Sequence, residues 1–266
     1  MSRLTPSSIT ARLLAYLRLS KVKYGIISDI HGNLDALDAV LDRLGNVDEI
    51  ICPGDIVGYG PDPNECCRKL RSLRRPVVIG NHDAAITGLM DLSWFNPAAY
   101  EAALWTRDTL DEDNLRYLSS LPAKYSTEEF LLVHASLNNP MEFHYILSPS
   151  MARPCFEEMS DYTLCFIGHT HISEIFVQRI GENGVDELFF TRGGKFDLRS
   201  GFRYIVNCGS VGQPRDGNKD AACGIFDSEA NSIEIIRVPY DIGAVQARMR
   251  GAGLPQSLVS RLDCGE

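Results

Sequence analysis

The sequence predicts an α/β protein in which two β-sheets pack face to face with helices on the outside, a four-layer α/β/β/α sandwich. In the first half, strand-like apolar runs alternate with helical stripes, and a βαβαβ order implies parallel strands with right-handed crossovers. In the second half, from Phe130 onward, short strand-like runs are joined by turns that carry Gly and Asn. A chain of 266 residues without a long linker fits one large domain.

The first half of the chain supplies alternating elements. A strand is expected over Val22–Ser28, and a helical stripe then runs until Gly45, formed by Leu34, Leu37, Val40, Leu41 and Leu44. Next come a strand over Glu49–Cys52, a helix over Asn64–Leu73, a strand over Pro76–Ile79 and a mostly helical stretch over Ala84–Leu121, clearest at Ala98–Leu110.

The second half is predicted to be mostly β. Strands are expected over Phe130–His134, Thr163–Ile167, Glu174–Arg179, Glu187–Thr191, Phe202–Val206, Gly224–Asp227 and Ser232–Val238, with a closing helix over Ile242–Arg250. The segment Asn138–Asp161 contains three prolines and has no clean periodicity. We interpret this segment as a candidate loop or cap over a functional site.

The start of the chain differs in charge from the rest. The first 28 residues contain no Asp or Glu but carry five basic residues, and the apolar spacing there is roughly helical. An acid-free, basic, Ser-bearing start resembles an organelle transit peptide. We favour the simpler interpretation, a basic N-terminal extension over residues 1–20 that could form a helix, followed by a single domain over residues 21–266.

Bulk properties exclude several functional classes. The net charge is −9, from 26 basic and 35 acidic residues, which argues against stable nucleic-acid binding but leaves a nucleotide substrate open. The eight cysteines include no Cys-x-x-Cys pair, so we expect free thiols in a reducing, cytoplasmic setting. No apolar stretch approaches the ~20 residues that a membrane span requires. The sequence does not indicate an oligomeric state.

Five of the six histidines lie in short motifs, most of which also carry Asp, Asn or Gly, and each motif follows a short apolar run. The motifs span residues 29–33 (DIHGN), 54–55 (GD), 80–83 (GNHD), 133–135 (VHA) and 168–171 (GHTH). One such motif alone would usually be a turn. Several that end neighbouring strands would gather at one rim of the sheets, where α/β proteins bind ligands. Imidazole and oxygen ligands of this kind suit two neighbouring divalent metals, and thus cleavage of phosphate esters.

The order of these motifs resembles the calcineurin-like metallophosphoesterase superfamily. The tail Asn207–Arg215 (NCGSVGQPR) is similar to its small bacterial phosphodiesterase branch, and the likeness covers roughly Lys23 to Val238. The resemblance implies a binuclear metal centre. By position in the motifs, Asp29, His31 and His171 would hold the first metal, Asn81, His134 and His169 the second, and Asp55 would bridge both.

The same resemblance implies a mechanism. A hydroxide held between the two metals would attack phosphorus in line, and His82 would be the catalytic residue beside the leaving-group oxygen, as proton donor or charge stabiliser. Mixed nitrogen and oxygen ligands do not select one metal. We expect Mn²⁺ first, with Fe, Zn, Ni or Mg as alternatives.

One motif departs from part of the superfamily. Protein serine/threonine phosphatases and symmetrical dinucleoside tetraphosphatases extend Gly-Asp to Gly-Asp-x-x-Asp/Ala-Arg-Gly, whereas this chain has Gly58 at the Asp/Ala position and Tyr59 at the Arg position. The phosphate-gripping Arg is therefore absent, and what orients His82 stays open. Arg215 could replace that Arg, and Asn33 and Tyr59 are further candidates for substrate binding. For Asn33 the alternative is a helix cap.

We therefore expect a phosphodiesterase or phosphatase that hydrolyses a small phosphate ester or nucleotide. One alternative is a catalytically inactive scaffold of the same fold that binds a protein partner. Another is an enzyme like the serine/threonine protein phosphatases or the dinucleoside polyphosphate hydrolases. The complete set of seven ligand positions together with His82 favours a catalyst.

Overall fold

The computed structural model describes residues 21–266. The expected basic extension over residues 1–20 lies outside the described residues, so the division into an extension and a single domain stays a prediction. Within residues 21–266, no helix has both the length and the apolar composition that a membrane crossing requires.

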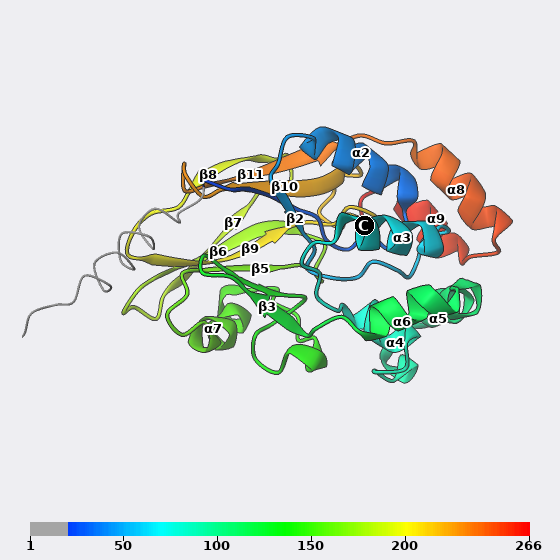
Figure 1. Ribbon diagram of the computed structural model, residues 1–266, viewed down its shortest axis with the longest axis horizontal. Helices are drawn as coiled ribbons and strands as arrows, with labels where there is room; N and C mark the ends of the chain where they lie inside the picture. The colour runs from blue at the N-terminus through cyan, green and yellow to red at the C-terminus, as the bar shows by residue number, and fades with distance from the viewer. Residues whose placement is uncertain (1–20) are drawn as a thin grey trace, which may run out of the picture.

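Two mixed β-sheets form the centre of the structure (Figure 1). The five-stranded sheet has the order β2 (Glu49–Ile51), β1 (Lys23–Ile26), β10 (Ala221–Asp227), β11 (Ser232–Val238) and β8 (Gly194–Asp197). The six-stranded sheet has the order β3 (Lys124–Ser126), β4 (Leu131–Val133), β5 (Leu164–Ile167), β9 (Phe202–Cys208), β6 (Ser173–Arg179) and β7 (Val185–Phe189). Strands β1 and β2 are parallel, as are β4, β5 and β9, whereas the other pairs are antiparallel.

A layer of apolar and aromatic side chains joins the two sheets. Tyr24 of β1 packs edge-on against Phe130 at 5.0 Å between ring centroids and stacks on Phe226 of β10 at 5.9 Å. Phe166 of β5 meets Phe130 at 5.3 Å. These rings belong to one buried cluster that draws residues from both sheets. Burial of this shared layer is the main favourable term that holds the sheets together.

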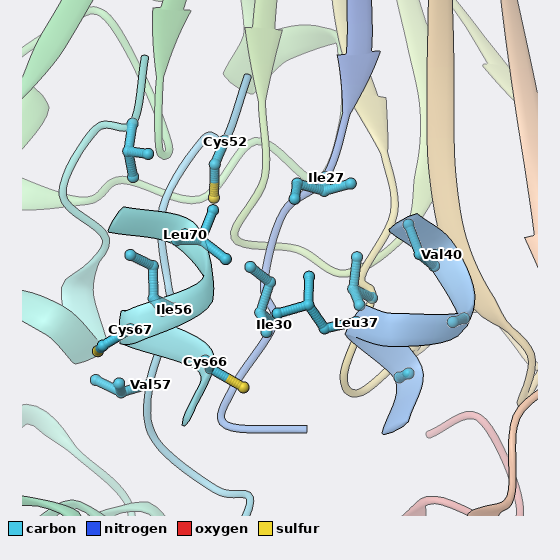
Figure 2. Close-up of a cluster of buried hydrophobic side chains, with 14 of the residues drawn as sticks. Ile27, Ile30, Leu37, Val40, Cys52, Ile56, Val57, Cys66, Cys67 and Leu70 are labelled. Atoms are coloured by element: carbon cyan, nitrogen blue, oxygen red, sulfur yellow. The ribbon is translucent and has the colours of Figure 1, made fainter. Parts of the chain in front are cut away.

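Helices cover the outer face of the five-stranded sheet. Helix α2 (Leu34–Leu44) lies over this face in Figure 1, and α3 (Pro63–Leu73) lies next to α2, toward the end of the sandwich where the other helices gather. Figure 2 shows the cluster beneath them, in which Leu37 and Val40 of α2 point toward Ile27 and Ile30 of the chain after β1. The predicted stripe and its stop at Gly45 agree with the observed α2.

The outer face of the six-stranded sheet is covered by α7 (Pro149–Glu158), on the opposite side from α2 (Figure 1). Its buried side chains are Ala152, Cys155 and Phe156, and they pack into a cluster with that sheet. The four layers predicted from the sequence are thus confirmed. Helix α7 itself lies inside the segment 138–161 that we interpreted as a loop or cap, because its prolines at 149 and 154 obscured the helical spacing.

The remaining helices gather at one end of the sandwich (Figure 1). They are α4 (Asn81–Ile86), α5 (Pro97–Thr109), α6 (Glu112–Ser119), α8 (Ile242–Gly251) and α9 (Gln256–Arg261), with 3₁₀ turns η1 (Leu92–Trp94) and η2 (Pro140–Glu142). The predicted strand over Pro76–Ile79 is reduced to one parallel bridge between Cys52 and Val77. Pro76 has no N–H, so the segment has fewer ladder donors than an ordinary strand.

Candidate metal centre

The predicted ligands lie in loops with an unusual backbone. Five of the seven adopt a left-handed conformation with φ between 51° and 71°, namely Asp29, His31, Asp55, His169 and His171. This conformation costs a non-glycine residue roughly 1–2 kcal/mol, so the surroundings must hold it in place. The loops after β1 and β2 do so by pairing with each other, since the N–H groups of Asp29 and His31 donate to the carbonyls of Gly54 and Asp55, both at 3.0 Å.

One group of buried side chains joins the two sheets. Asp29, His31 and Asp55 follow strands of the five-stranded sheet, and His171 follows β5 of the other sheet. One ligand atom from each of the four lies within 4.8 Å of all the others. The Nε2 atoms of His31 and His171 are 3.0 Å apart, and Asp29 Oδ1 is 3.4 Å from His171 Nε2.

A second group shares Asp55 with the first. Its other members are His134, after β4, and His169, after β5, again with ligand atoms within 4.8 Å of one another. Asp55 Oδ2 is 3.6 Å from His31 Nε2 and 3.4 Å from His134 Nε2. Asn81, at the start of α4, places Oδ1 3.1 Å from His134 Nε2. The structure therefore brings all seven predicted ligands together, with Asp55 between the two groups.

Backbone carbonyls orient three of the imidazoles. Nδ1 of His31 lies 3.2 Å from the carbonyl of Val57, and Nδ1 of His171 lies 2.6 Å from that of Gln213. Nδ1 of His134 lies 2.7 Å from the Pro53 carbonyl. A carbonyl can only accept, so each Nδ1–H donates and each Nε2 presents a lone pair to the centre. Such outer contacts are typical of histidines that bind metals.

The electrostatics of the histidines suit ligands. Burial lowers the pKa of His31, His169 and His171 well below the usual value, which keeps these rings neutral, the form that coordinates a cation. Burial would also lower the pKa of His134, but the Asp55 carboxylate raises it to about 9. A cation at Asp55 would compete with that proton, because ligands bind in their deprotonated form.

The two carboxylates differ. Burial, joined by the charge of Asp55, raises the pKa of Asp29 to about 6. Burial acts in the same direction on Asp55, but the neighbouring imidazoles, His134 first, hold its pKa well below the usual range. The donor set of two carboxylates, one amide oxygen and four imidazoles is therefore chemically suited to a pair of divalent cations.

His82 lies beside the ligands in the first turn of α4. Its backbone N–H donates to Asp55 Oδ1 at 2.9 Å. Its ring contacts the rings of His31, Tyr59 and Phe95, with centroids 4.4–4.8 Å away. Its Nδ1 is buried without a hydrogen-bond partner among residues 21–266. Aromatic packing, rather than a carboxylate, thus orients this ring.

Gly58 leaves the space that the His82 ring occupies. A Cβ built on Gly58 would lie only 2.5 Å from His82 Nδ1, and the glycine has a φ of +95°. Asp83 holds the same loop from the other side, since its carboxylate accepts from the N–H groups of Ile56, Val57 and Gly80 at 3.0–3.2 Å.

The three predicted substrate residues differ in their surroundings. Asn33 accepts from the Ala36 N–H as the cap of α2 and donates to the Gly212 carbonyl at 3.0 Å, so both ends of its amide are engaged. Tyr59 packs on His31 at 4.5 Å. Arg215 donates to the Tyr59 hydroxyl at 3.3 Å. Tyr59 and Arg215 therefore lie together at the edge of the first ligand group.

Several residues near the centre were not predicted from the sequence. Phe143 packs against His134 at 5.8 Å, and Tyr145 stacks on His169 at 3.9 Å, both from the segment 138–161. A pocket of about 280 Å³ opens beside them and is lined by Asn81, Met90, Trp94, Phe95, Glu142, Phe143, His144, Tyr145 and His169. The aromatic residues of the segment 138–161 were the feature of the sequence that could have indicated these contacts.

Comparison with known proteins identifies relatives along nearly the whole chain. The model of the calcineurin-like phosphoesterase superfamily domain matches residues 22–231. An uncharacterised protein of Methanocaldococcus jannaschii is 36% identical over 252 residues, which are 92% of this chain and 99% of that protein. The crystal structure of a metallophosphoesterase from Sphaerobacter thermophilus superimposes with a TM-score of 0.83 at 43% identity and covers 93% of this chain and 100% of that one.

A more distant relative bears an enzyme name. The symmetrical bis(5'-nucleosyl)-tetraphosphatase of Glaesserella parasuis is 30% identical over 120 residues. That match covers 42% of this chain and 44% of the tetraphosphatase.

Proposed function

The chain belongs to the calcineurin-like phosphoesterase superfamily and is a metal-dependent phosphoric ester hydrolase, and we propose that it cleaves small phosphodiesters or nucleotides at a binuclear centre. The proposal rests on one observation above all. Seven buried side chains from both sheets converge in two groups that share Asp55. Turn chemistry or packing alone would not require so many buried ligand atoms in one place.

The proposed ligands are those that the sequence predicted. Asp29, His31 and His171 would hold one cation and Asn81, His134 and His169 the other, with Asp55 between them. A pair of divalent cations in such a centre activates water and neutralises charge on the phosphoryl oxygens. We propose Mn²⁺ as the first metal to test, because mixed nitrogen and oxygen ligands accept it and availability often decides.

His82 would act on the leaving group. Burial lowers its pKa to about 4, so the ring is neutral at pH 7. A neutral imidazole can still donate an N–H hydrogen bond to the departing oxygen and stabilise its charge. The packing by Tyr59 and Phe95 holds the ring in place for that contact. His82 is thus the proposed catalytic residue of the protein itself.

The substrate class is proposed from the size of the site. A pocket of about 280 Å³ beside Asn81 and His169 is close to the size of small-molecule sites. The tetraphosphatase relatives support a nucleotide substrate, although the match to them covers less than half of either chain.

The seven buried thiols and the exposed Cys264 are all free, which supports a reducing, cytoplasmic location.

The test is hydrolysis of bis-p-nitrophenyl phosphate and p-nitrophenyl phosphate by the purified protein with added Mn²⁺, Zn²⁺ or Ni²⁺. We expect turnover and two bound metals per chain by elemental analysis. The variant His82→Ala should keep both metals and lose turnover by about 10²–10⁴-fold. Loss of metal in that variant would assign His82 a different role. No turnover with any metal, together with tight binding of a protein partner, would favour the scaffold alternative.

A further inference from the structure

Two arginines meet at one neutral acceptor beside the ligand groups. Arg215 Nη2 donates to Gln213 Oε1 at 2.9 Å, and Arg261 Nη1, from the end of α9, donates to the same oxygen at 3.4 Å. Within residues 21–266, neither guanidinium forms an ion pair with a carboxylate. The two partly buried guanidiniums therefore lie close together, and no carboxylate of the described residues contacts either of them.

Other arginines of the same region are neutralised. Arg248 of α8 pairs with Asp35 and Asp62, and Arg237 of β11 forms a buried ion pair with Asp216. Burial, followed by the charge of Arg215, lowers the pKa of Arg261, and Glu266 opposes this with a weaker effect. Charges placed together in this way are unfavourable unless an anion binds between them.

Unused donors are present at the same place. Arg215 Nε and Gln213 Nε2 are buried and have no hydrogen-bond partner among residues 21–266. Gln213 is 1% exposed, so water does not readily satisfy its amide. A buried donor without a partner is costly, and the negative charge of an anion held by the two guanidiniums would lower that cost. The overall charge of −9 makes this local concentration of donors more notable.

The segment that carries Arg215 and Gln213 is connected directly to the ligand loops. The backbone N–H of Arg215 donates to the His171 carbonyl at 3.1 Å, and the Gln213 carbonyl accepts from His171 Nδ1. Tyr59, which Arg215 contacts, packs against His31 and His82. Helices α8 and α9 join this face because they share a buried cluster with Tyr59. An anion on the pair would thus lie next to the first ligand group.

We propose that Arg261, together with Arg215 and Gln213, forms a second anion subsite that binds a further phosphate of the substrate. A substrate that fills the ligand groups and this subsite together carries at least two phosphates, as in a phosphoanhydride. Arginine matches phosphate oxygens with two parallel hydrogen bonds, which favours phosphate over a simple halide. This inference rests on the proposed function, since the first phosphate must occupy the metal centre.

The experiment compares two inhibitors of bis-p-nitrophenyl phosphate hydrolysis by the Mn²⁺-loaded protein: inorganic phosphate and pyrophosphate. For Arg261→Gln we expect the ratio of the pyrophosphate to the phosphate inhibition constant to rise about tenfold. Arg261→Lys, which keeps a charge but loses the fork, should give a smaller rise. Metal chelation by pyrophosphate is the same for each protein and cancels in the comparison.

Arg250→Gln is the matched control, because Arg250 is an exposed arginine of the neighbouring α8 that also contacts a glutamine, Gln246. Its ratio should equal that of the unaltered chain. Equal ratios for Arg261→Gln, Arg261→Lys and the unaltered chain, in proteins that still hydrolyse the ester, would overturn the inference alone. An unaltered chain without any hydrolysis would instead contradict the proposed function.

Discussion

The packing of Gly58 against His82 leads to a sharp prediction. In Gly58→Ala the new methyl group would lie 2.5 Å from His82 Nδ1 and 3.0 Å from its Cγ, so the ring must move. The same change places a non-glycine residue at a φ of +95°, where the strain costs roughly 1–2 kcal/mol. We expect both effects together, a loss of stability and a displaced ring.

A control can separate these effects. Gly181 has a φ of +85°, and a Cβ there would meet no atom within 4 Å. Gly181→Ala should therefore lose roughly 1–2 kcal/mol by strain, as Gly58→Ala does, but keep its turnover. Displacement of His82 should lower kcat by about 10²–10⁴-fold in Gly58→Ala only, with both metals retained.

The assay combines urea unfolding, elemental analysis and hydrolysis of bis-p-nitrophenyl phosphate. If Gly58→Ala keeps kcat within about twofold of the unaltered chain, the position of His82 does not limit turnover, against the role proposed for it. A loss of metal instead of turnover would show that the loop between Asp55 and Gly60 is what the methyl group disturbs.

Three further predictions concern other parts of the molecule. Arg215→Ala should raise KM for small phosphate esters about tenfold or more, as expected for a lost charged contact, whereas an unchanged KM would remove it from the site. Burial raises the pKa of Glu174 to about 8, so its protonated form stabilises the fold below about pH 4.5, and this contribution is lost as the pH rises to 8. Relative to the unaltered chain, Glu174→Gln should therefore gain stability between pH 5 and pH 8 in urea titrations, and parallel curves would contradict this. Leu37→Ala, at a fully buried position of α2, should cost about 2–5 kcal/mol of unfolding free energy, and a cost below 1 kcal/mol would show that the core collapses around the deletion.

Most of the fold could be predicted from the sequence because the strongest sequence signals are local. The apolar stripe from Leu34 to Leu44 and the stop at Gly45 together predicted where α2 begins and ends. Strands without such a signal were missed. All three residues of β3 are exposed, and β8 has a similar pattern, so neither shows an apolar run. Their place in the sheets is set by long-range pairing with β4 and β11, which no short window contains.

The candidate site was predictable where motifs end strands and unpredictable elsewhere. Asp29, Asp55 and His134 each follow an apolar run, so their meeting at one rim could be inferred. Arg261 lies far along the chain from these motifs and reaches the site only because α9 packs on Tyr59. The left-handed backbone at the ligands could not be inferred either, since Asp and His usually adopt negative φ.

The ligand loops come from both halves of the sandwich, with Asp55 following a strand of one sheet and His134 following a strand of the other. Any cation held by these two side chains would therefore cross-link the two sheets. Its binding free energy would oppose separation of the two halves, and the molecule would unfold at a higher temperature with the cation bound than without it.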